Sequence, residues 1–154
     1  MYLVVVLLLM LVLPVGSAAA ELLRSPNGIS WLAATGKWFV FYTAGIRLLT
    51  AGIRQFIQPG FTARQIFHME SDDALPIIRE LGVANFATGL AGVLSLWRPS
   101  FTLPVALIAA VFYGIAGVRH IVEKGKSFNE NIAMVTDLFA AAVFLVYVVG
   151  VWIE

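Results

Sequence analysis

The sequence predicts an all-α protein that crosses a membrane several times. Of its 154 residues, 60% are hydrophobic and only 12% are charged, whereas a soluble domain is typically about half apolar and about a quarter charged. The apolar residues form long runs, and about 20 such residues cross a bilayer core roughly 30 Å thick. Because lipid cannot hydrogen-bond to the backbone, these runs must be helical. We expect one polytopic transmembrane helix bundle over residues 1–154.

About five stretches are long enough to span a bilayer. The first is apolar except for Gly16 and Ser17. The segment from Ser17 to Ala20 also looks like a signal cleavage site, but no Lys or Arg precedes the apolar run. We therefore favour a retained helix, while cleavage would leave four spans. The predicted spans are 2–20, 29–57, 74–97, 101–122 and 132–153.

Polar breaks delimit the predicted spans. Gln58-Pro59-Gly60 ends the second span. The capping-box spacing that begins at Thr62 predicts a short helix at the membrane interface, over 63–69. Ser71 is suited to cap the third span, and Pro76 falls in its first turn, where a missing N–H costs little. Short connections such as these predict antiparallel neighbours.

The distribution of cations orients the bundle. Several of them lie in or beside the loops that join the second span to the third and the fourth to the fifth: Arg54, Arg64, Arg119, Lys124 and Lys126. The opposite side has fewer cations, and it carries an aromatic belt of Trp31, Trp97 and Trp152. By the positive-inside rule, the N-terminus is cytoplasmic and the C-terminus lies outside.

Ionisable and amide side chains within the spans form the candidate site. Such residues are costly in a bilayer and usually face a partner inside the bundle. The helices bring several of them to a similar depth, so we expect an arginine of the second span to pair with Glu80 or Asp137. The cluster can be a structural staple, a site for a polar ligand or lipid headgroup, or a path for ions or protons. Its members are Arg47, Arg54, Glu80, Asn85, His120, Asn131 and Asp137.

His120 does not point to a metal or a cofactor. A single histidine at a helix end usually bonds locally or to a carboxylate, and ligation of haem or chlorophyll is the alternative. The other histidine, His68, lies in the interfacial segment, which disfavours a two-histidine haem site. The chain has no cysteine, no repeated metal-ligand spacing, no phosphate-binding glycine loop and no nucleophile elbow. No catalytic residue, metal or cofactor is implied, and a net charge of +1 gives no surface for nucleic acid.

Small residues line one face of each of two spans. Gly82, Gly89 and Gly92 share a face of the third span, and Gly114 and Gly117 share a face of the fourth. Small faces let helices approach closely in lipid. Because a short loop joins these two spans, we expect the faces to pack on each other, with a homo-oligomer contact as the alternative.

Three motifs in the second half of the chain carry a resemblance. They are Glu80-Leu81-Gly82-Val83-Ala84-Asn85 followed by Gly89, then Gly114-Ile115-Ala116-Gly117-Val118-Arg119-His120, and finally Asn129-Glu130-Asn131 followed by Asp137. With these motifs the chain resembles an uncharacterised family of small bacterial integral-membrane proteins, classed as a domain of unknown function. The first half matches loosely. The resemblance implies a protein of the bacterial cytoplasmic (inner) membrane with a polar interior cluster, and it implies no activity.

Three functions remain open on the sequence. We favour a non-enzymatic structural or accessory component of the lipid bilayer, acting alone, as a homo-oligomer or within a larger membrane complex. The second is a carrier or channel for protons, ions or a small polar solute that uses the polar cluster. The third is a membrane enzyme acting on a lipid or quinone, with His120 and Glu80 as acid and base.

Overall fold

The computed structural model describes residues 2–25, 28–65, 69–123, 125–126 and 128–154. These residues are almost entirely helical, and no strand occurs among them, so the predicted all-α fold is confirmed. Four helices are long and apolar enough to cross a membrane: Leu3–Arg24, Asp72–Leu94, Pro99–Val122 and Glu130–Ile153.

The first long helix continues beyond its apolar stretch. It consists of α1 (Tyr2–Leu7), a π-helical segment (Leu8–Val12) and α2 (Leu13–Arg24). The expected end at residue 20 is therefore too early. The extension carries Glu21, whose carboxylate accepts hydrogen bonds from Lys37 Nζ and Trp38 Nε1, each at 2.6 Å. These contacts to the next helix stabilise the extra turn.

The second long helix also contains a π-helical segment. It consists of α3 (Trp31–Phe39), the π-helical segment Val40–Ile46 and α4 (Arg47–Ile57). Ser30 caps its start by accepting a hydrogen bond from Ala33 N at 3.1 Å. At 1.5 Å per residue the run is about 40 Å long, enough to cross a bilayer. This helix contains cations and is not among the four strongly apolar helices. Its role as a fifth membrane span therefore stays a prediction.

The short interfacial helix begins earlier than expected. It is α5 (Pro59–Gln65), and residues 66–68, including His68, lie outside the described part of the chain. Pro59 ends α4 but opens α5, because the first turn of a helix does not need its missing N–H. Ser71 is a cap, as predicted: its hydroxyl accepts a hydrogen bond from Asp73 N at 3.2 Å. It opens a 3-10 turn (Asp72–Ala74) that leads into α6 (Leu75–Leu94).

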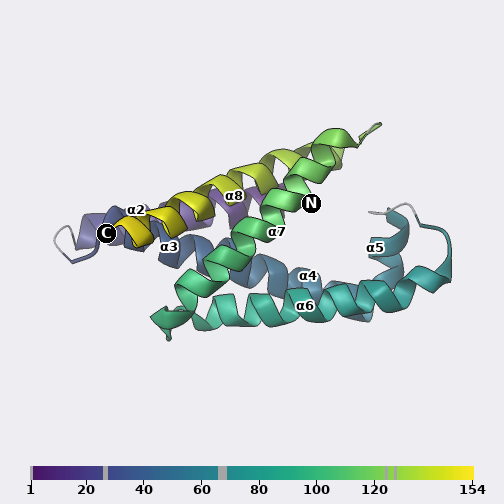
Figure 1. Ribbon diagram of the computed structural model, residues 1–154, viewed down its shortest axis with the longest axis horizontal. Helices are drawn as coiled ribbons and strands as arrows, with labels where there is room; N and C mark the ends of the chain where they lie inside the picture. Colours follow the sequence, from purple (N-terminus) through teal and green to yellow (C-terminus); the bar gives the residue numbers. More distant parts are fainter. Residues whose placement is uncertain (1, 26–27, 66–68, 124, 127) are drawn as a thin grey trace.

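The last two long helices form an antiparallel pair. A 3-10 turn (Pro99–Phe101) leads into α7 (Thr102–Val122), and α8 (Phe128–Ile153) begins before the expected residue 132. Figure 1 shows α7 and α8 running together in one arm of the molecule, while α4 and α6 form the other. The arms of α6 and α7 meet at the Pro99 turn and diverge from there (Figure 1). Stacked Tyr113 and Phe144, both fully buried, lie in the core.

The small-residue face of α6 packs on α4 and on the π-helical segment before it. A Cβ atom added at Gly89 would lie 2.2 Å from Leu49 N, and one added at Gly52 would lie 2.4 Å from Phe86 N. At Gly92 an added Cβ would lie 2.7 Å from Gly45 Cα. The two backbones are therefore in direct contact, which only glycine permits.

The expected packing of the third span on the fourth is wrong. On α7, a Cβ atom added at Gly117 would meet the Leu138 side chain of α8 at 2.7 Å, and one at Gly114 would meet only Ala141 Cβ, at 3.7 Å. The small face of α7 therefore turns toward α8. A short loop makes two helices neighbours at one end, but the matching glycines of a third helix decide which faces are in contact.

Candidate functional site

An ion pair between two helices lies at the centre of the candidate site. Arg47, the first residue of α4, donates a hydrogen bond from Nη1 to Asp137 Oδ1 in α8 at 3.2 Å. The two side chains are only 18% and 8% exposed. The guanidinium carbon also lies 5.1 Å from the centre of the Tyr113 ring, a cation–π distance. The pair thus connects the second and fifth predicted spans, and Tyr113 of α7 lies against its arginine.

The two π-helical segments hold this region together. Thr43, one turn before Arg47, donates a hydrogen bond from Oγ1 to the carbonyl of Leu9 in the other π-helical segment, at 3.1 Å. Tyr113 Oη donates to the carbonyl of Thr43 at 2.7 Å. Both accepting carbonyls lie within π-helical turns, which are frequent at functional sites. The helical segment that leads into Arg47 is therefore anchored to the first helix and to α7.

A cavity of about 450 Å³ lies beside the ion pair. Its walls come from the first helix, α4, α5, α6, α7 and α8. The cavity brings together five members of the predicted polar cluster: Arg47, Arg54, Asn85, His120 and Asp137.

Arg54 lines this cavity without a carboxylate partner among the described residues. Its guanidinium carbon lies 3.6 Å from the centre of the Phe61 ring in α5. The side chain is otherwise exposed. The aromatic ring holds the cation in place without neutralising it.

Glu80 and Asn131 line neither this cavity nor the larger one described below. Glu80 is exposed on α6. The α6 glycines, Gly82 among them, face α4, and two residues along a helix correspond to roughly 200° of rotation. Glu80 therefore points away from the cluster. Asn131 is exposed in the first turns of α8.

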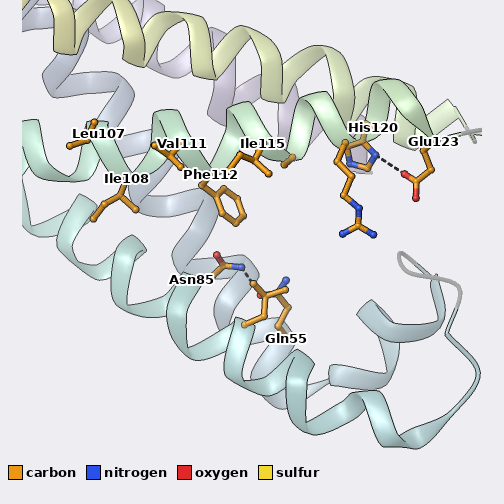
Figure 2. Close-up of a pocket in the computed structure, with 12 residues that line it drawn as sticks. Gln55, Asn85, Leu107, Ile108, Val111, Phe112, Ile115, His120 and Glu123 are labelled. Atoms are coloured by element: carbon orange, nitrogen blue, oxygen red, sulfur yellow. Dashed lines mark hydrogen bonds and ion pairs between the residues drawn. The ribbon is translucent and has the colours of Figure 1, made fainter.

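A larger cleft of about 740 Å³ lies between the two arms. Apolar side chains of α7 line most of its length, and His120 and Glu123 stand at one end (Figure 2). Asn85 and Gln55 lie on the other arm, across from Phe112 (Figure 2). Because Gln55, Asn85 and His120 line both spaces, the cleft adjoins the cavity beside the ion pair.

Two side chains of the site, Gln55 and Tyr113, are not among the residues predicted from the sequence. Asn85 is only 5% exposed, and its Nδ2 donates to Gln55 Oε1 at 2.8 Å. Gln55 could have been noticed as an amide next to Arg54 inside an apolar span. Tyr113 could have been noticed as a hydroxyl near the middle of a span, where it must find an acceptor.

His120 is paired within its own helix end. Its Nδ1 lies 3.2 Å from Glu123 Oε2, and Lys126 Nζ donates to the carbonyl of His120 at 2.7 Å. In the part of the chain that the structure describes, no three acidic or histidine side chains are grouped to hold a metal ion. Glu80, which the membrane-enzyme alternative pairs with His120 as acid and base, lines neither of the cavities that His120 lines.

The comparison with protein families extends the resemblance to the whole chain. The model of a family of unknown function, DUF6790, matches residues 4–153. No curated protein and no solved structure matches the chain. The predicted membership of a family of unknown function is therefore confirmed, and the match includes the first half, where the motifs were loose.

Proposed function

The chain belongs to the DUF6790 family, whose function is unknown, and we propose that it is a non-enzymatic, structural or accessory component of the bacterial cytoplasmic membrane. The observation that supports this role is the closed polar network inside the bundle. Among the described residues, every buried side-chain nitrogen or oxygen has a hydrogen-bond partner. Arg47 and Asp137 have each other. A satisfied pair of this kind holds two helices in one register.

A buried ion pair that only holds two helices together has a distinctive response to mutation. Removing one partner leaves a buried charge without compensation and costs about 3–5 kcal/mol, whereas replacing both with apolar residues is often neutral. We expect Asp137→Asn to lower the free energy of unfolding in detergent by about this amount. The double variant Arg47→Met/Asp137→Leu should recover most of the loss. Glu80→Gln, on the exposed side of α6, is the control and should change little.

A carrier or channel for protons, ions or a small polar solute is the second candidate. The observation that favours it is the cavity of about 450 Å³ that reaches both members of the ion pair. In that case Asp137→Asn abolishes flux into proteoliposomes while the protein stays folded, and the double variant does not restore flux. If both variants fold as the unmodified protein does and both lose flux, the staple is contradicted and transport is supported.

The accessory role has a separate test. The protein, extracted gently from its own membrane, is examined by native mass spectrometry and by its absorption spectrum. We expect a stoichiometric assembly with another membrane protein or with further copies of the chain. A monomer that moves a solute across proteoliposomes would contradict the accessory role.

A further inference from the structure

We propose that the cleft between α6 and α7 binds an anionic phospholipid of the cytoplasmic leaflet, with the acyl chain along α7 and the phosphate group at Arg54 in the adjoining cavity. This site goes beyond the structural role proposed above and does not depend on it. It uses the open space between the arms and Arg54 in the adjoining cavity, whereas the structural role uses the ion pair of Arg47 with Asp137.

The shape of the cleft fits a chain-like amphiphile. Its volume of about 740 Å³ lies within the range of roughly 300–1,000 Å³ that is typical of small-molecule sites. Leu107, Val111 and Ile115 line it along α7 at intervals of four residues. These positions cover about 12 Å of helix, which gives an apolar wall for one segment of an acyl chain (Figure 2).

The polar groups of the cleft lie in its half toward the end of α7. Arg119, His120 and Glu123 line the cleft at that end, and Asn85 and Gln55 lie across from Phe112 on the other arm (Figure 2). An occupant must therefore be apolar at the end beside Leu107 and polar toward the end of α7. A phospholipid has this distribution, whereas a free inorganic anion would use only the polar end.

The charge at the polar end selects an anionic headgroup. The two carboxylates nearby are already engaged, because Glu123 contacts His120 and Asp137 binds Arg47. Arg54 lines the adjoining cavity with no carboxylate partner among the described residues, and Phe61 positions its guanidinium. The planar guanidinium of an arginine can bind two oxygens of a phosphate at once, which makes a phosphate group a strong partner for it.

The depth of this cation also matches a lipid phosphate. Arg54 lies one turn before the end of α4, and His120 lies in the last turn of α7. The predicted topology puts both helix ends at the cytoplasmic interface. A lipid from that leaflet can therefore enter sideways between the arms without taking its headgroup into the bilayer core.

The test compares lipids that share their acyl chains and differ in headgroup charge. Native mass spectrometry of the full chain in detergent is used to measure the apparent Kd for phosphatidylglycerol and for phosphatidylcholine. We expect phosphatidylglycerol to bind about tenfold more tightly, or about 1.4 kcal/mol. Arg54→Gln should remove this preference. Arg98→Gln removes the same charge at the other end of α7, and this variant should keep the preference for phosphatidylglycerol.

A second pair of variants tests the apolar wall. Val111 lines the cleft and is 55% exposed, whereas Val146 on α8 does not line it and is 56% exposed. Val111→Trp should fill the cleft and weaken the binding of phosphatidylglycerol by tenfold or more. Val146→Trp should leave the Kd unchanged. Far-UV circular dichroism of both variants checks that the helices are intact.

Several results would overturn the proposal. They are equal affinity for the two lipids, an unchanged preference in Arg54→Gln, equal effects of the two tryptophans, or displacement of the lipid by inorganic phosphate at similar concentration. The proposal would also be overturned if the unmodified protein retained a second copy of the chain or another protein and Val111→Trp released it. The occupant of the cleft would then be a polypeptide.

Discussion

A single methyl group placed between α4 and α6 tests the close backbone contact of the two helices. Gly89→Ala puts a Cβ atom 2.2 Å from Leu49 N and 2.6 Å from Leu49 Cα. Both neighbours are backbone atoms, so no side-chain rotation relieves the overlap. The helices must separate by about 1 Å to restore van der Waals contact, and this separation loosens packing along the whole glycine face. Overpacking of this kind costs about 1–3 kcal/mol.

The control isolates packing from helix propensity. Gly114→Ala is also a substitution within a long apolar helix, but its Cβ meets only Ala141 Cβ, at 3.7 Å, an ordinary contact. Replacing glycine with alanine inside a helix gains about 0.8–1 kcal/mol in each case. We therefore expect Gly89→Ala to be less stable than Gly114→Ala by about 1–3 kcal/mol.

Unfolding of both variants in mixed micelles of mild detergent and dodecyl sulfate, followed by far-UV circular dichroism, measures this difference. The unmodified protein is the reference, and the slope of each transition shows whether the same surface is exposed. If Gly89→Ala unfolds at the same detergent ratio as Gly114→Ala, or at a higher one, the direct contact of α4 with α6 is refuted.

Two further substitutions probe hydrogen bonds and surface charge. Tyr113→Phe removes the hydrogen bond from Tyr113 Oη to the buried carbonyl of Thr43. We therefore expect the free energy of unfolding to fall by about 1–3 kcal/mol in the same experiment. An unchanged free energy of unfolding would show that this carbonyl finds another donor. Asp72→Asn breaks the ion pair of Asp72 with Arg64, and both of these side chains are more than half exposed. We therefore expect the free energy of unfolding to change by less than about 1 kcal/mol, and this change should disappear at high salt. A larger change in about 0.5 M salt would contradict this expectation.

The candidate site shows which part of a polar cluster a sequence can predict. Arg47 and Asp137 interrupt apolar runs, which predicts buried charges that need partners, and the structure brings the two side chains together. Glu80 also interrupts an apolar run, but it lies on the exposed side of α6. Depth in the membrane follows from position along the chain. The direction of a side chain around the helix axis does not, because it depends on how the whole helix is rotated.

The sequence by itself determined the class of the protein, the approximate extent of its helices and its family. These properties depend on composition, on the length of apolar runs and on local caps such as Ser71, all of which can be read along the chain. Only the tertiary structure decided that α6 packs on α4, that Arg54 faces Phe61 and that α6 and α7 diverge to leave a cleft. Such contacts require two surfaces that are far apart in the sequence to match in shape. In lipid, this match in shape decides which helices pack together, because hydrophobicity does not distinguish a neighbouring helix from the lipid chains.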